Sequence, residues 1–255
     1  MVARKTKPRK RHVQTVLRLK VDKNGQRRGG KRPGAGRKPR GERASERHKA
    51  RPELNARHPQ HVTMRVVSGV GWLRRRDAYR AVRGALARVA ATHHAFRIVH
   101  LSVQGTHIHA LCEATDKVAL ARGVQAFQVS AAKRINRVVS ERSGTKREGR
   151  VFGDRYHVES ISSVRQTRHA LAYVLNNWRR HGEDSGRVGL FGGRVDPFSS
   201  GIAFDGWRGA IETWPRPLEY EAPGVCRPQT WLLAEGWKRA RPIGAFEVPG
   251  PRRAV

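Results

Sequence analysis

Proline is absent from residues 61–182, and the apolar residues of this stretch recur at the spacings of strands and helices. Alternation predicts a strand, and recurrence every three or four residues predicts a helix, because side chains share a face at these periods. The predicted elements are, in order, a strand over 61–67, a helix over 76–94, strands over 96–103 and 107–113, a helix over 116–141, a strand over 150–160 and a helix over 163–181. This order predicts an α+β fold, the ferredoxin-like split βαβ sandwich with an antiparallel sheet and one added C-terminal helix.

Basic residues outnumber acidic residues so strongly that the formal net charge is +33, which indicates a nucleic-acid partner. About half of this excess lies in residues 1–60, which are poor in large apolar residues. Such a stretch cannot bury enough surface to offset its ordering entropy, so we expect a disordered basic arm. Its candidate DNA contacts are Arg37, Lys38 and Arg40, in a pattern that looks like part of an AT-hook but also fits a nonspecific basic tail.

Residues 183–255 form a third region, which is rich in glycine, proline and tryptophan and has a helical pattern only at 230–240. We expect its tryptophans to cap the core rather than to stack on bases. No apolar run approaches the length of a membrane span, and Cys112 and Cys226 stand in unrelated contexts. These features exclude an integral membrane protein, a disulfide scaffold and a zinc finger. They predict a cytoplasmic protein that associates with the nucleoid. Its central domain, residues 61–182, is flanked by basic tails.

The sequence His107-Ile108-His109 lies within a predicted strand, so both imidazoles should point to one face of the sheet. Two imidazoles on one face are a ready pair of metal ligands, although two polar residues on a solvated face would give the same pattern. Cys112 falls on the opposite face, and Glu113 lies about 13 Å along the strand from His109. Neither is a good candidate for the same metal site.

Tyr173 lies in the last predicted helix, away from the apolar stripe that includes Leu171 and Trp178. Asn177 follows one helical turn later on the same face, and its amide oxygen could bind a metal ion. A tyrosine in that position is less easily explained by packing alone. Phosphodiester cleavage by a tyrosine hydroxyl needs a metal ion, and two histidines and an amide could hold it.

Four stretches of residues 61–182 resemble, in the same order, the IS200-type Y1 transposases, and more closely the REP-associated tyrosine transposases. The stretches read HVT at 61–63, VQGTHIH at 103–109, GRVFGDRYH at 149–157 and ALAYVLNN at 170–177. By this resemblance His107 and His109 match the family's HUH metal ligands, where U is a bulky apolar residue. Tyr173 matches the single nucleophilic tyrosine, and Asn177 matches the amide that completes the metal site.

The resemblance implies a metal-dependent transposase that cleaves and rejoins single-stranded DNA with Mg²⁺ or Mn²⁺. It implies a 5′-phosphotyrosine intermediate, a released 3′-hydroxyl and a hairpin or palindromic repeat as substrate. A homodimer is compatible with this function. Thr106 stands where the relatives usually have Asn, and Trp178 stands where many have Pro, but neither departure removes a ligand.

Two alternatives remain open at this point. One is a non-catalytic nucleic-acid-binding protein that keeps the fold and the charge, and the other is a related HUH nickase of plasmid or phage replication. Tyr156 is the only rival nucleophile, and we interpret it as a packing or substrate-contacting residue. The candidate DNA contacts outside the arm are Lys133, Arg134, Arg137, Arg155, Arg165 and Arg168.

Overall fold

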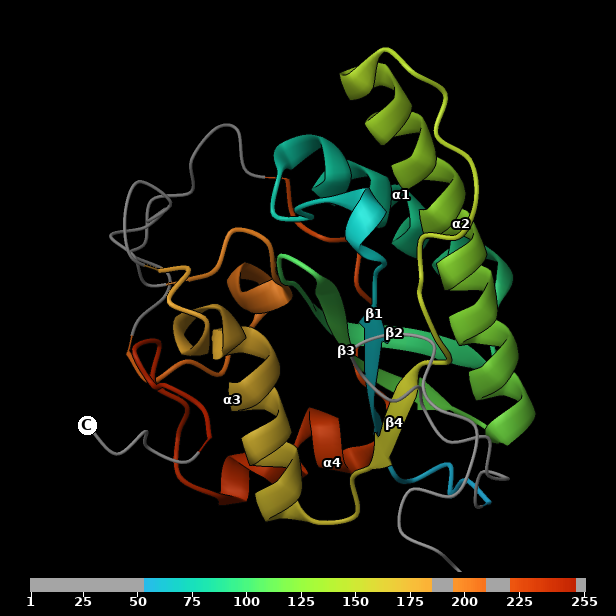
Figure 1. The fold of residues 1–255 in the computed structure, drawn as a ribbon. Helices are drawn as coiled ribbons and strands as arrows, with labels where there is room; N and C mark the ends of the chain where they lie inside the picture. The colour runs from blue at the N-terminus through green and yellow to red at the C-terminus, as the bar shows by residue number, and fades with distance from the viewer. Residues whose placement is uncertain (1–52, 185–194, 210–220, 251–255) are drawn as a thin grey trace, which may run out of the picture. The chain divides into compact units, whose positions relative to one another are not determined.

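The computed structural model describes residues 53–184, 195–209 and 221–250 (Figure 1). The strands are β1 (Gln60–Arg65), β2 (Phe96–Val103), β3 (His107–Ala114) and β4 (His157–Ser160). The helices are α1 (Arg76–Thr92), α2 (Lys117–Ser143), α3 (Val164–Arg180) and α4 (Trp231–Ala234). Arg37, Lys38 and Arg40 of the predicted basic arm lie outside the described residues.

The four strands form one antiparallel sheet in the order β2-β3-β1-β4. This is the order of a ferredoxin-like split βαβ fold, so the predicted α+β class is confirmed. The predicted strand over 150–160 is the main difference, since only its last four residues form β4. Its first part hydrogen-bonds irregularly to the end of β1, with the Gly153 N–H donating to the carbonyl of Arg65, and buries Val151.

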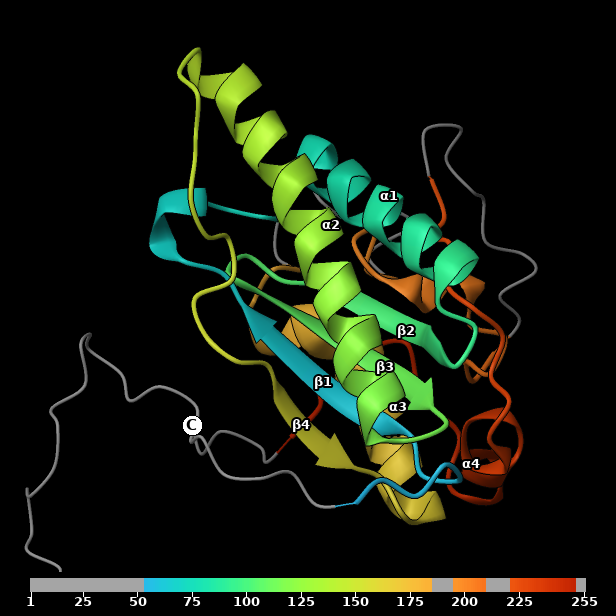
Figure 2. The same ribbon diagram turned by 90° about the vertical axis from the view of Figure 1, so that its right-hand side faces the viewer.

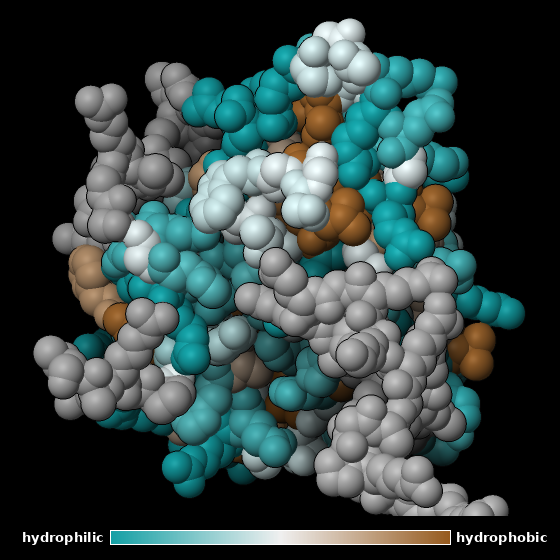
Figure 3. All heavy atoms as spheres, viewed as in Figure 1, coloured by the Kyte–Doolittle hydropathy of each residue, from teal (hydrophilic) through white to brown (hydrophobic). Residues whose placement is uncertain are grey.

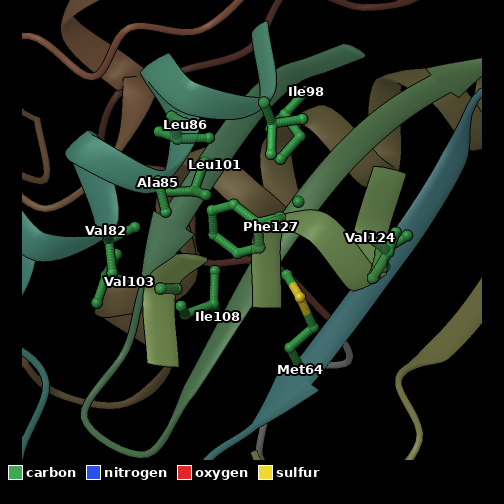
Figure 4. Close-up of a cluster of buried hydrophobic side chains, with 14 of the residues drawn as sticks. Met64, Val82, Ala85, Leu86, Ile98, Leu101, Val103, Ile108, Val124 and Phe127 are labelled. Atoms are coloured by element: carbon green, nitrogen blue, oxygen red, sulfur yellow. The ribbon is translucent and has the colours of Figure 1, made fainter. Parts of the chain in front are cut away.

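Helices α1 and α2 cover one face of the sheet, and α3 covers the other (Figures 1 and 2). Between α1, α2 and the sheet, apolar side chains form a buried cluster around Phe127 (Figure 4). Met64 and Ile108 enter this cluster from β1 and β3, while Val82 enters it from α1. Alternation along β3 therefore turns Ile108 into this cluster and leaves its two histidine neighbours on the α3 face.

On the other face of the sheet, α3 packs together with the C-terminal region in a second apolar cluster. Leu171 and Leu175 of α3 meet Leu111 of β3, and Trp207 and Trp237 close the cluster from the C-terminal side. Both tryptophans are 5% exposed, as expected for residues that cap a core, whereas Trp231 is 49% exposed. Trp214 lies outside the described residues. Helix α3 is consequently covered by the sheet on one side and by the C-terminal region on another.

A C-terminal strap, residues 241–249, runs along α3 and is bound by polar side chains of that helix. The guanidinium of Arg168 donates to the main-chain oxygens of residues 241 and 242 and pairs with the carboxylate of Glu247. The Asn176 amide donates to the carbonyl of Gly244 over 2.9 Å. The structure thus gives Arg168, expected above to contact DNA, a buried role in holding the strap.

A buried ion cluster around Arg74 joins three distant parts of the chain. Its guanidinium donates to both carboxylate oxygens of Asp196, over 2.9 and 3.0 Å, and its Nε lies 2.7 Å from a carboxylate oxygen of Glu183, just after α3. It also donates to the carbonyl of Val103 at the end of β2. Burial raises the pKa of Asp196, and the charge of Arg74 opposes that change. Arg74 therefore ties the end of α3 to the sheet.

The face of the molecule shown in Figure 3 is mainly hydrophilic, and the apolar residues on it are scattered in small groups. Among the described helices, none combines the length and the apolar character that crossing a lipid bilayer requires. Both observations agree with the strongly basic composition.

His100 on β2 makes the stability of the fold depend on pH. Its ring is buried between Ser200, whose Oγ lies 3.2 Å from Nδ1, and Phe204, and burial lowers its pKa from 6.5 to about 4. Between pH 4 and pH 6.5 the imidazole of His100 is protonated in the unfolded chain and neutral in the folded chain. The free energy of unfolding should therefore be fully retained above pH 6.5 and should fall, by at most about 3 kcal/mol from this residue, as the pH drops to 4.

Urea unfolding of the metal-free protein at pH 7.5, 6 and 5 measures this effect, with His100→Gln as the comparison because its amide can still bond Ser200. We expect the wild type to lose more stability than the variant over this range. Equal losses in the two proteins would contradict the assignment.

Candidate active site

Four aromatic rings meet on the sheet face that carries α3: His61 of β1, His107 and His109 of β3, and Tyr173 of α3. The ring centroids of His107 and His109 are 4.7 Å apart, and that of His61 lies 5.2 Å from His109. The Tyr173 ring stands edge-on to both, at 5.1 Å from His109 and 5.6 Å from His61. The structure thus brings together the tyrosine and the two histidines selected from the sequence.

The two ring nitrogens of His109 have different surroundings. Nδ1 lies 3.1 Å from Oγ1 of Thr63 and 3.2 Å from Nε2 of His61, the neighbours that β1 places beside it. Nε2 is buried and has no hydrogen-bond partner in the part of the chain that the structure describes. A proton on Nδ1 can be donated to Thr63 or His61, which leaves the lone pair of Nε2 free for a ligand.

Burial keeps the histidines of this cluster neutral at physiological pH. It lowers the pKa of His61 and of His107 to about 4, and that of His109 well below 6.5. The charges of His181, whose ring lies 5.4 Å from that of His107, and of Arg65 act in the same direction on His107. Neutral imidazoles are the form that binds metal ions.

Asn177 lies one helical turn after Tyr173 and differs from the sequence-based expectation in its burial. The side chain is fully buried, because both flanks of α3 are covered. Within residues 53–184, 195–209 and 221–250, neither Oδ1 nor Nδ2 has a hydrogen-bond partner. A buried amide without partners is costly unless another group satisfies it. Among the described residues no three His, Cys, Asp or Glu side chains form a metal-binding group. Imidazole nitrogens and an amide oxygen are atoms of the kind that bind a divalent cation, and Nε2 of His109 and Oδ1 of Asn177 have no hydrogen-bond partner among the described residues.

Three residues that the sequence analysis did not choose as metal ligands or nucleophile lie away from the ring cluster. Cys112 is buried in the cluster on the opposite face of the sheet, and so is Tyr156. The carboxylate of Glu113 accepts hydrogen bonds from the main-chain N–H groups of Gln229 and Thr230, away from the histidines.

The candidate DNA-binding cations are not gathered at one place. Lys133, Arg134 and Arg137 are exposed on α2, which covers the face of the sheet opposite Tyr173. Arg165 is exposed in the first turn of α3, and Arg155 is half-buried before β4. Arg165 thus lies on the helix that carries Tyr173, two turns before it, and Arg155 precedes β4, which pairs with β1.

Sequence reasoning missed one member of this cluster, His61, and two residues that contact it, Thr63 and His181. His61 and Thr63 were noted only as part of a matching stretch, and His181 was taken as the end of a helix. Alternation alone puts 61 and 63 on one face of a strand, but only the pairing of β1 with β3 shows that they face His109.

Residues 61–177 match the family model described as IS200-like transposase. The family resemblance that the four motifs indicate is thereby confirmed for this segment. The members of that family are transposases, so this segment, a little under half of the chain, is similar to proteins that process DNA. No curated protein matches the sequence significantly.

Two similar solved structures are a REP-associated tyrosine transposase bound to a REP hairpin and a bacterial tRNA(His) guanylyltransferase-like protein in complex with GTP. The first shares 16% identity with a TM-score of 0.42, and the match covers 54% of this chain and 75% of that one. The second shares 12% identity with a TM-score of 0.35, and the match covers 53% and 70%. At these values neither neighbour indicates what this chain binds.

Proposed function

We propose that residues 61–182 are the catalytic domain of a metal-dependent, single-tyrosine transposase that cleaves and rejoins single-stranded DNA. The observation that carries this proposal is the convergence of Tyr173 with His109, a buried imidazole whose Nε2 has no hydrogen-bond partner within the described ranges. A non-catalytic binding protein would have no need for a tyrosine ring packed against a buried, neutral histidine. The family match of residues 61–177 supports the same class.

In the proposed reaction the Tyr173 phenol loses its proton and its oxygen forms a bond to phosphorus. The bond from phosphorus to the 3′ oxygen breaks, and this oxygen leaves with the electron pair and takes up a proton. The strand that keeps the 5′-phosphate stays on Tyr173 as a phosphotyrosine, and the other strand ends in a 3′-hydroxyl. Attack of a 3′-hydroxyl on the phosphotyrosine reverses these changes and rejoins the strand.

His107, His109 and Asn177 would hold Mg²⁺ or Mn²⁺. A bound divalent cation polarises the phosphate and offsets charge on the leaving oxygen. The protein's part is to keep both imidazoles neutral by burial and to orient His109 through its Nδ1 contacts with Thr63 and His61.

The motif resemblance favours a hairpin or palindromic repeat as the DNA substrate. We assign backbone contacts to Arg155 and Arg165 beside the ring cluster, and to the basic arm of residues 1–60 with Arg37, Lys38 and Arg40. Lys133, Arg134 and Arg137 on α2 would reach DNA that wraps around the opposite face of the sheet. The high positive charge makes such binding strongly salt-dependent.

The proposal is tested by incubating the protein with labelled single-stranded hairpin oligonucleotides and Mn²⁺, followed by a denaturing gel. We expect a covalent protein–DNA adduct. His107→Ala and His109→Ala should abolish the adduct and lower Mn²⁺ affinity in calorimetry by at least about tenfold, while DNA affinity changes little. His169→Ala is the matched control, because His169 is an exposed histidine of α3 outside the cluster.

Mn²⁺ affinity that is unchanged in both strand variants would refute the assigned ligands. No adduct with any of the metals or hairpins would refute the enzymatic function and favour the non-catalytic binding protein.

A further inference from the structure

Trp72, in the loop between β1 and α1, is a large aromatic residue that stays 53% exposed. Its six-membered ring packs on Gly105, in the turn between β2 and β3, where a Cβ atom would come within 2.4 Å of two ring atoms. The Leu73 N–H donates to the carbonyl of Gly105 over 2.8 Å. The absence of a side chain at Gly105 thus makes room for the ring, and the hydrogen bond fixes the loop beneath it.

The turn that supports Trp72 belongs to the edge of the candidate active site. His107, the first residue of β3, follows Gly105 by two positions, and its ring lies 5.4 Å from that of His181 at the end of α3. The Gly105 N–H also bonds the carboxylate of Glu183. Trp72 therefore lies where the start of β3 and the end of the tyrosine-bearing helix meet.

The charges around Trp72 are predominantly positive. Arg65 is exposed and pairs in register with His107, and Arg75 is exposed three residues after Trp72. Arg147 donates to the carbonyl of Gly69 in the same loop. The carboxylates nearby are already engaged, since Asp77 pairs with Arg142 over 2.9 Å and Glu183 pairs with Arg74. Asp77 also lies 3.8 Å from Arg75, a longer pair between exposed side chains.

Trp231 provides a comparison within the same chain. It is 49% exposed, but the guanidinium of Arg239 lies over its ring at 5.0 Å. Among the described residues no cation lies over the ring of Trp72, so one side of this indole is available for another planar group. An exposed aromatic ring surrounded by cations suits a ligand with a flat base and anionic phosphates.

We propose that Trp72 stacks on a base of the single-stranded DNA next to the cleavage site, while Arg65 and Arg75 contact the adjoining phosphates. This inference rests on the proposed function. It extends the candidate active site along the DNA strand, over the turn between β2 and β3, and assigns that surface to an unpaired nucleotide rather than to duplex, whose stacked bases cannot reach the ring.

The test measures fluorescence anisotropy of a labelled hairpin oligonucleotide with single-stranded flanks at several salt concentrations. Trp72→Ala should weaken binding about tenfold at every salt concentration, because stacking is not electrostatic. Trp72→Phe should retain most of the affinity, and Trp231→Ala, the matched control, should bind as the wild type does. Arg65→Gln should instead reduce the slope of affinity against salt by about one ion.

A second measurement reports the stack directly. With 2-aminopurine placed at successive flank positions, one position should be quenched by the wild type and not by Trp72→Ala. If Trp72→Ala binds DNA and quenches 2-aminopurine as the wild type does, the stacking role is refuted. Formation of the covalent protein–DNA adduct would leave the proposed function intact in that case. If Trp231→Ala weakens DNA binding as much as Trp72→Ala does, the stacking role of Trp72 is refuted as well. If the wild type forms no covalent adduct, this result refutes the proposed function and not the stacking of Trp72.

Discussion

Replacing Tyr173 with phenylalanine should abolish the covalent protein–DNA adduct and leave folding and DNA binding nearly unchanged. The substitution removes one oxygen from a half-buried ring, so the free energy of unfolding should change by no more than about 0.5 kcal/mol. The hydroxyl is the only group of this side chain that can attack phosphorus. A denaturing gel measures the adduct, and urea unfolding with anisotropy measures the other two properties.

Tyr156→Phe is the matched control for this prediction. Tyr156 is buried in the cluster on the opposite face of the sheet, so its variant should still form the adduct. Peptide mass spectrometry of the wild-type adduct identifies the modified residue. A nucleotide found on Tyr156, or an adduct that persists in Tyr173→Phe, would overturn the choice of nucleophile.

Replacing Arg74 with alanine should lower the free energy of unfolding by about 3–5 kcal/mol. The guanidinium is almost completely buried, and its loss would leave the carboxylate of Asp196, which is fully buried, without its counter-charge. Glu183 would lose its pairing at the same time. Arg74→Lys should recover only part of the loss, because an ammonium group cannot donate to both carboxylates and to the Val103 carbonyl with the geometry of a guanidinium.

Urea unfolding at pH 7 measures this effect. Arg75→Ala is the comparison, since Arg75 is a neighbouring arginine whose side chain is 54% exposed, and it should change stability by about 0.5 kcal/mol or less. A loss below about 1 kcal/mol in Arg74→Ala would show that the buried cluster contributes little net stability, as some buried ion pairs do.

The elements of this fold were predictable where their signals are local. Alternation and helical spacing gave the strands and helices of residues 61–182 within a few residues, and they put His107 and His109 on one face. The strand over 150–160 was overestimated, because Gly153 and the pairing with the end of β1 break its regularity, and neither effect is visible in a hydrophobic pattern.

Contacts between distant residues were harder to predict. The approach of Tyr173 to His109 depends on how α3 packs on the sheet, and the motif resemblance rather than the periodicity pointed to it. The roles of Thr63 and His61 require the register of β1 against β3. Arg168 was misinterpreted because a basic chain offers no local sign of which arginine is buried, and its partners lie more than 70 residues away.

If residues 61–182 cleave and rejoin DNA as proposed, the strap of residues 241–249 has a consequence for the rejoining step. It is bound to α3 through Arg168, Asn176 and Arg179 of the same helix that carries Tyr173. If Tyr173 carries the cut 5′ end, that end is fixed to a helix braced on two sides. The 5′ end would then stay at the position of cleavage, and the free 3′-hydroxyl of the strand to be joined would have to move to it. Exchange of partners would therefore be a motion of DNA over a stationary protein anchor.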